Sequence, residues 1–223
     1  MKRITLTICA ATLLLAACNN EKKTEKSSLD NSSDTTTTTT GKMDEKNPEP
    51  YTMPDSVTMM KNWETYMTPG DMHAMLAKSN GTWTTEITSW MDPSKPPVKS
   101  TGTSVNKMVM GGRYQEGTHT GNVMGMPFEG RSLTGYDNGK KAFVSSWIDN
   151  MGSGIMLMEG AWDEATKSIT MKGRGMDPMT LKEYDYKQVY KMVDDNTEIM
   201  EMYGPGHDGK EYKMMEIKYT RKK

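Results

Sequence analysis

The chain has 223 residues and balances 28 Lys and Arg against 29 Asp and Glu, so its formal charge is −1. This near-neutral balance argues against nucleic acid as a partner, because phosphate binding calls for an excess of basic side chains. The two cysteines, Cys9 and Cys18, both lie near the N-terminus, so no disulfide is expected within the folded part.

The N-terminus has the pattern of a secretion signal. Two basic residues precede the apolar run 4–15, which is too short to span a membrane. The following Leu15-Ala16-Ala17-Cys18 resembles the bacterial lipobox, in which the cysteine is acylated and begins the mature chain. An ordinary signal peptide or a short anchor helix is the alternative. We expect a lipoprotein signal peptide over residues 1–17 and a lipid on Cys18. That lipid would hold the protein to a membrane of the bacterial cell envelope, on the periplasmic face or at the cell surface.

Residues 18–53 contain almost nothing apolar to bury and include a run of six threonines at 35–40. This composition is typical of a disordered tether. We expect it to hold a single folded domain, residues 54–223, clear of the lipid headgroups.

The domain begins with a helical pattern. Apolar side chains recur at three- and four-residue steps, at Met59, Met60, Trp63 and Met67. Thr68-Pro69-Gly70-Asp71 then predicts the start of a second helix, with Thr68 as its N-cap. The apolar face of this second helix is expected at Met72, Met75 and Leu76. The helices would cap one end of the domain, either as a lid over a cavity or as a plug that closes a hydrophobic end.

After Gly81 the pattern predicts strands to the end of the chain. The candidate strands are 82–90, 101–110, 113–121, 128–137, 141–149, 155–163, 168–175, 181–193, 197–203 and 211–221. Short turn sequences rich in Gly, Asn and Asp separate them, so successive strands should be antiparallel neighbours. The predicted fold is mainly β: one antiparallel meander of about ten strands that closes into a barrel and so removes its exposed edges.

The clearest hairpin runs from Met126 to Asp149 around Asn138-Gly139, a dipeptide typical of two-residue type I′ loops. This loop predicts that Asp137 faces Lys140 and that Gly130 faces Trp147, where the glycine leaves room for the indole. One face of the hairpin carries Phe128, Gly130, Tyr136, Phe143 and Trp147, and the other carries Glu129, Arg131, Leu133, Val144 and Ile148.

The first face has the larger apolar area, so we expect it to line the interior. Its aromatic side chains are the candidate ligand-binding residues, Phe128, Tyr136, Phe143 and Trp147. If the other face were interior, Glu129 and Arg131 would form a charge-paired polar spot that could orient a ligand.

No sequence pattern indicates catalysis. The G-x-S-x-G elbow is missing, and no free thiol is expected in the domain. His73, His119 and His207 match no zinc-ligand spacing. A capping or surface role is expected for His73, and a solvated strand face for His119. No catalytic residue, metal ligand or cofactor is therefore predicted.

Methionine is the compositional outlier, at 24 residues against 2 Phe. Several methionines form M-x-M pairs, among them Met124 with Met126 and Met156 with Met158. On a strand the two members share a face, so their thioethers could converge on a soft ion such as Cu(I). Alternatively, methionine does the packing normally done by Leu and Phe, or exposed methionines consume oxidants through reversible sulfoxides.

Two family resemblances follow from local motifs. Gly81-Thr82-Trp83, with Arg221 near the chain end, is similar to the structural signature of the lipocalin and fatty-acid-binding superfamily. This resemblance implies a lipocalin-like, calycin-type barrel in which Trp83 packs near Arg221 at the closed end.

The region 59–221 more specifically resembles a bacterial domain of unknown function, number 1579. The motifs that carry this likeness are Thr68-Pro69-Gly70 with His73, Gly111-Gly112-Arg113-Tyr114, Gly135-Tyr136-Asp137 within its hairpin, and Glu216-Ile217-Lys218-Tyr219-Thr220-Arg221. That family implies no activity.

The leading hypothesis is therefore a membrane-anchored extracytoplasmic lipoprotein whose barrel binds a small apolar or amphipathic ligand. A Met-rich envelope buffer of Cu(I) or oxidative stress, and an enzyme of unknown type, are the alternatives.

Overall fold

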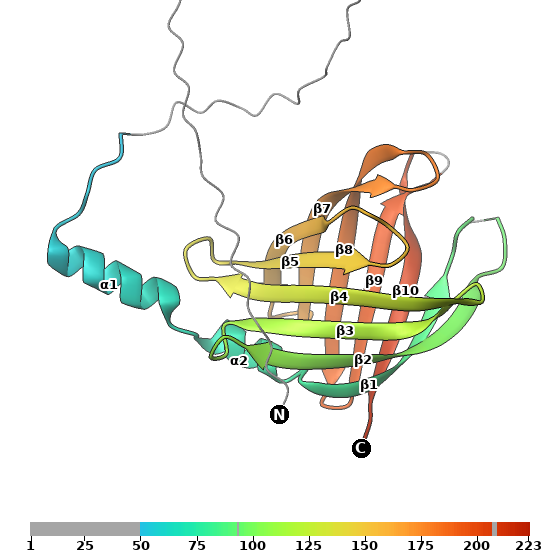
Figure 1. The fold of residues 1–223 in the computed structure, drawn as a ribbon, viewed down its shortest axis with the longest axis horizontal. Coiled ribbons are helices and arrows are strands. Elements are labelled where there is room, and N and C mark those ends of the chain that lie inside the picture. Colours follow the sequence, from blue (N-terminus) through green and yellow to red (C-terminus); the bar gives the residue numbers. More distant parts are fainter. Residues whose placement is uncertain (1–49, 93, 207–208) are drawn as a thin grey trace, which may run out of the picture. The chain divides into compact units, whose positions relative to one another are not determined.

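The computed structural model describes residues 50–92, 94–206 and 209–223, and residues 52–223 form a compact unit (Figure 1). The predicted signal peptide, the lipidation site Cys18 and most of the predicted tether lie outside the described residues, as does His207. Two helices come first, α1 (Ser56–Met67) and α2 (Asp71–Ala77). The strands are β1 (Gly81–Ser89), β2 (Val98–Val109), β3 (Tyr114–Val123), β4 (Met126–Asp137), β5 (Ala142–Asp149), β6 (Met156–Asp163), β7 (Ser168–Asp177), β8 (Lys182–Asp194), β9 (Thr197–Pro205) and β10 (Glu211–Arg221).

Each strand pairs antiparallel with its neighbours in sequence, and β1 also pairs with β10, so the ten strands close into a barrel. The predicted fold class, mainly β with a single antiparallel meander barrel and short N-terminal helices, is confirmed. Because strand direction alternates, the links fall alternately at two ends. We call the end that carries α2 and the β4–β5 turn the helix end, and the opposite end the loop end.

Helix α2 plugs the helix end. Met75 and Leu76 are buried in the main core, and Gln115 of β3 donates a hydrogen bond to the carbonyl of Leu76 at 2.6 Å. His73 is also buried; its Nδ1 accepts from the backbone N–H of Gly70 at 3.0 Å. The structure therefore favours a plug over a lid, and His73 is a buried capping residue.

The predicted start of α2 was wrong in one respect. Gly70, rather than Thr68, is the N-cap of α2, whereas Thr68 ends α1, where its N–H and its hydroxyl both donate to the carbonyl of Glu64. The physical reason is that the imidazole of His73, three residues after Gly70, accepts a hydrogen bond from the N–H of Gly70 and so fixes the start of the helix there. Helix α1 itself has no buried residue.

The register predicted for the β4–β5 hairpin was wrong by two residues. Asp137 pairs with Ala142 and Tyr136 with Phe143, because the loop has four residues and places its positive φ at Lys141. Asp137 accepts hydrogen bonds from the N–H groups of Gly139 and Lys140. Asn138 does not shape a two-residue turn; its side-chain amide instead donates to the carbonyls of Thr65, Tyr66 and Thr68 at the end of α1.

A two-residue shift preserves the face of every side chain. Glu129 and Arg131 form an ion pair at 3.0 Å with both side chains about half exposed, so their face is exterior. The glycine still makes room for the indole, since a Cβ at Gly130 would lie 2.6 Å from the Trp147 ring.

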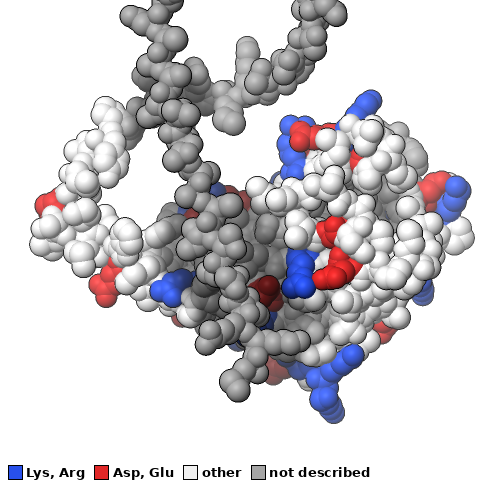
Figure 2. All heavy atoms as spheres, in the orientation of Figure 1, with Lys and Arg blue, Asp and Glu red and all other residues white. Residues whose placement is uncertain are grey.

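On the face shown in Figure 2, acidic and basic side chains are interspersed rather than gathered by sign.

The first and last strands meet around a buried indole. Trp83 is fully buried, donates from Nε1 to the carbonyl of Ser79 at 2.9 Å, and has the Arg221 guanidinium 4.1 Å above its ring. Arg221 also donates to three backbone carbonyls, those of Lys78, Asn80 and Asp195. Gly81 has a φ of 122°, and a Cβ there would approach the guanidinium at 3.1 Å. Gly81, Trp83 and Arg221 thus tie β1, β10 and the end of α2 together.

We expect Arg221→Ala to lower the free energy of unfolding by about 3 kcal/mol, because it removes hydrogen bonds from a charged donor and a cation–π contact. Urea unfolding would measure the loss. Arg131→Ala is the matched control and should stay within about 0.5 kcal/mol, since its ion pair is exposed. Equal losses in the two variants would contradict a special role for Arg221.

Candidate functional site

The inner surface of the barrel has two chemically different walls. The wall from β2 to β5 carries hydroxyl, amide and imidazole groups, at Ser104, Asn106, Gln115, His119, Ser132, Thr134 and Ser145. The wall from β6 to β10 is mostly Met, Ile and Tyr, including Met158, Ile169, Met171, Tyr186, Met200 and Met202. In the ring of ten strands β3 is five places from β8, so these walls face each other.

His119 is the centre of the polar wall. It stands opposite Ser104 of β2, whose Oγ is 3.1 Å from its Nδ1, and its Nε2 is 3.2 Å from Oγ of Ser132 on β4. Gly117 permits this approach, because a Cβ there would lie 2.4 Å from Oγ of Ser132 and 2.7 Å from Nε2 of His119. We call His119, Ser104, Ser132 and Asn106 the His119 cluster.

One direction of proton donation satisfies the cluster. The Ser104 hydroxyl donates to Oδ1 of Asn106 at 3.4 Å, so Nδ1 of His119 carries the proton and donates to Ser104. Nε2 is then the acceptor, and the Ser132 hydroxyl donates to it. Ser132 keeps its own acceptor capacity on the interior side of the wall.

Burial lowers the pKa of His119 to about 4, because desolvation penalises the imidazolium. The side chains that meet the ring, Ser104, Ser132 and the Trp147 indole, are all uncharged. At neutral pH the cluster therefore presents neutral donors and acceptors.

Aromatic rings extend the cluster along the wall. The Trp147 ring centre is 5.0 Å from that of His119, and Phe128 stacks on Trp147 at 6.4 Å with an interplanar angle of 19°. Asp149 accepts from the Trp147 Nε1 at 2.7 Å and so fixes the indole. The result is a continuous polar and aromatic surface toward the loop end.

The four candidate ligand-binding residues fall into two groups. Phe128 and Trp147 lie beside the His119 cluster. The rings of Tyr136 and Phe143 instead pack against each other near the helix end, with their centres 5.0 Å apart. The Tyr136 ring centre also lies 5.9 Å from that of His73 on α2. Phe143 is fully buried in the core, so this second group belongs to the plugged end.

Sequence reasoning missed the His119 cluster, and the solvated face predicted for His119 was wrong. A usable signal was the strand Gly117-x-His119-x-Gly121, where alternate glycines share the face of the histidine. Ser132 likewise alternates with Gly130, which was already assigned to the face of Trp147.

The M-x-M pairs separate into exposed and interior positions. Met124 and Met126 are exposed at the β3–β4 turn, whereas Met156 and Met158 belong to the core on β6. In the described part of the chain, no group of three or more His, Cys, Asp or Glu residues is arranged to hold a metal ion. Buried Met75, Met158, Met171 and Met200 do the packing work of larger aliphatic residues.

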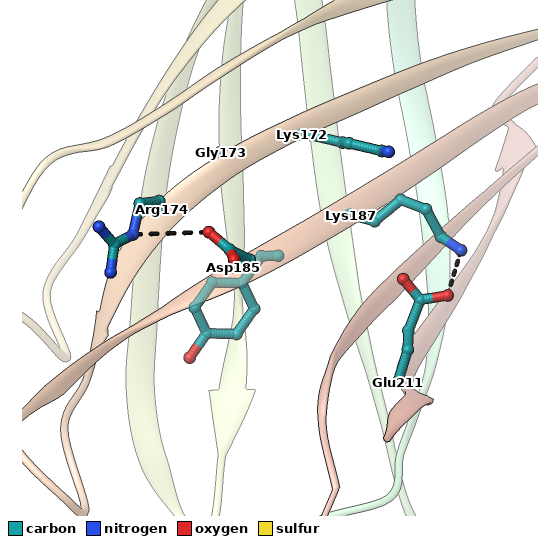
Figure 3. A pocket seen from close by; sticks show the side chains of 7 residues that line it. Lys172, Gly173, Arg174, Asp185, Lys187 and Glu211 are labelled. Carbon is teal, nitrogen blue, oxygen red and sulfur yellow. Dashed lines mark hydrogen bonds and ion pairs between the residues drawn. The ribbon is translucent and has the colours of Figure 1, made fainter. Parts of the chain in front are cut away.

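An open hollow of about 430 Å³ lies over β7, β8 and the start of β10 (Figure 3). Four of its five charged side chains form two pairs: Arg174 lies 3.5 Å from Asp185, and Lys187 binds Glu211, whereas Lys172 is the fifth. The hollow is open and lined mostly by paired surface charges, so we place the candidate site at the interior wall instead.

The low pKa of His119 predicts a pH dependence of stability. Between about pH 6.5 and 4 the unfolded chain binds a proton at this residue that the folded chain does not, so stability falls as the pH falls through this window. At about 1.4 kcal/mol per pKa unit the loss is limited to about 3 kcal/mol.

Urea unfolding at a series of pH values would measure this loss, and His119→Gln should flatten the curve between pH 6.5 and 4. His73→Gln is the comparison: burial lowers the pKa of His73 as well, so this variant loses the His73 part of the slope and keeps the His119 part. If the His119→Gln curve keeps the wild-type slope, the histidine is solvated and titrates normally.

Comparison with curated proteins gave no match. A family model described as protein of unknown function (DUF1579) matches residues 68–221, which include α2 and all ten strands. The chain therefore belongs to the DUF1579 family of proteins of unknown function.

Proposed function

We propose that this protein is a lipid-anchored protein of the bacterial envelope that binds a small amphipathic molecule inside its barrel. The polar group of the ligand meets the His119 cluster, and its apolar part lies against the Met and Tyr wall. The observation that carries the proposal is the division of the interior into a hydrogen-bonding wall and an apolar wall that face each other.

The neutral state of the cluster and the free acceptor capacity of Ser132 favour an uncharged hydrogen-bond donor, such as a hydroxyl. Ser132 has acceptor capacity to offer, and the imidazole of His119 is uncharged at neutral pH. An anionic headgroup would lose its hydration there without meeting a cation, because the side chains that contact His119 are uncharged.

The low pKa of His119 favours binding over catalysis. Ser132 and His119 stand as a nucleophile and a base would, at 3.2 Å. However, a base with a pKa of about 4 takes up a serine proton poorly at neutral pH, because efficient proton transfer needs a pKa near the working pH.

The envelope location is supported by the sequence alone. The basic and apolar segments before Cys18, and the small residues next to it, are what a lipid-modified cysteine requires. Within the described residues, no helix has the length and apolar character needed to cross a bilayer.

Ligand binding can be tested by displacement of the neutral probe phenylnaphthylamine from the purified protein. We expect decanol to displace the probe at lower concentration than decanoate, since only decanol presents an uncharged hydroxyl. Ser132→Ala should weaken decanol binding about 2- to 10-fold, the worth of one hydrogen bond.

Ser146→Ala is the matched control, because Ser146 pairs with exposed Leu133 and shares the outward phase of β5. It should leave decanol binding unchanged. A preference for decanoate, or an equal effect of the two serine variants, would contradict the proposed site.

Anchoring is tested separately by labelling cells with a radioactive fatty acid. Wild-type protein should take up the label, and Cys18→Ser should abolish it, because the acyl chain is attached to the cysteine sulfur. Cys9→Ser should not, since Cys9 lies in the segment removed with the signal. Labelling that persists in Cys18→Ser would rule out the lipid at this position.

A further inference from the structure

Helix α1 carries a continuous apolar stripe that leaves most of its area uncovered in the described structure, where only the Tyr66 ring lies close to the barrel, at Gly139. Residues at steps of one, three and four share one side of a helix, and here that side holds Met59, Met60, Trp63, Tyr66 and Met67. All five are exposed, with Met60 at 71% and Trp63 at 70%. Isolated exposed apolar residues are ordinary, but a contiguous stripe on one helix marks an interaction surface.

Hydrogen bonds cap the start of the helix and tie its end to the barrel, although none of its residues is buried. At its start, Asp55 accepts from the N–H groups of Val57 and Thr58, both at 3.0 Å. At its end, Asn138 of the β4–β5 turn donates to its last carbonyls, and Gly139 lies close to the Tyr66 ring. The barrel therefore presents the stripe rather than packing on it.

We propose that the stripe docks α1 in the interface of a lipid bilayer, so that the domain lies at the headgroups rather than clear of them, as its tether predicts. Its composition fits that environment: Trp63 and Tyr66 have polar atoms on apolar rings, as interfacial side chains do, and the methionines supply pliable apolar area. The helix carries one Lys and one Glu, so its apolar face rather than its charge would provide the binding.

The proposal rests on the proposed lipid at Cys18 for the nearness of the bilayer. Thirty-seven residues separate Cys18 from the start of α1 at Ser56. Even fully extended, that length reaches only about 120 Å, so an acylated chain keeps α1 close to its membrane. An interfacial helix beside that lipid would add a second contact with the same bilayer.

Docking would also orient the barrel. Because Asn138 joins α1 to the β4–β5 turn, a helix lying in the interface brings the helix end toward the bilayer. The loop end, toward which Phe128 and Trp147 extend the polar wall, would then face away from the lipid.

The test uses the full chain in phosphatidylcholine vesicles that contain brominated lipid, which quenches nearby tryptophan. We expect the wild type to be quenched and Trp63→Phe to lose most of that quenching. Trp162→Phe is the control and should keep it, because Trp162 lies on β6 and bonds to Glu164. Quenching that is the same in Trp63→Phe as in the wild type would overturn the proposal.

A second pair of variants guards against indirect effects. Met60→Glu places a charge on the stripe and should abolish the Trp63 quenching, whereas Thr65→Glu adds the same charge on another side of the exposed helix and should not. If sedimentation shows that the wild type is a dimer and Met60→Glu a monomer, with no lipid quenching in either, the stripe binds a second copy and the proposal fails.

The proposed lipid on Cys18 and the proposed docking of α1 can be rejected independently. Mass measurement of the N-terminus shows whether Cys18 is acylated, and the fluorescence comparison works equally on an unacylated chain mixed with vesicles. Acylation without quenching would therefore reject the helix while leaving the anchor in place.

Discussion

Closure of the sheet through β1 and β10 is the constraint on which the rest of the structure depends. The pair runs over seven residue pairs, from Trp83 opposite Arg221 to Ser89 opposite Met215, and at its first pair a buried indole, a guanidinium and three backbone carbonyls come together. Once the barrel is closed, every strand has one face inside it. The alternation of side chains then decides which chemistry lines the interior.

The closed barrel contains two kinds of buried polar group. Glu198 connects elements of the fold, whereas the His119 cluster lines the interior. Glu198 is nearly fully buried at the helix end, where Ser79 donates to it at 2.5 Å and Tyr190 donates to its other oxygen. Burial raises the pKa of Glu198, so charging it costs stability as the pH rises through the raised pKa. Both of its oxygens are engaged, so Glu198 joins α2 to β8 and β9.

Much of the architecture could be predicted because turn chemistry is local. Gly111-Gly112 has positive φ at both residues, as a tight reversal requires, and β10 ends at Arg221 as expected. The β4–β5 register could not be read this way. Asn138-Gly139 has a local preference for a two-residue loop, but α1 recruits the Asn138 amide, and Asp137 closes a wider turn. A contact between segments about seventy residues apart overrode the local rule.

The candidate site likewise has a part that local sequence predicts and a part that only the pairing of distant strands creates. Phe128 and Trp147 could be placed on the interior face because aromatic area and alternation are visible in one hairpin. The His119 cluster takes one or two small polar residues from each of three strands, and none is conspicuous alone. Only the pairing of β2 with β3, and of β3 with β4, brings them together.

The His119 cluster differs from Glu198 in a way that bears on function. A hydrogen bond contributes only about 1 kcal/mol net to folding, and apolar side chains of similar volume would serve a barrel core at least as well. The opposite wall shows that this chain can fill an interior with methionine. Polar groups at functional sites are commonly kept at a cost to stability. A polar wall whose Ser132 retains acceptor capacity, beside a partly buried histidine held neutral, is therefore the part of the interior on which the proposal of ligand binding rests.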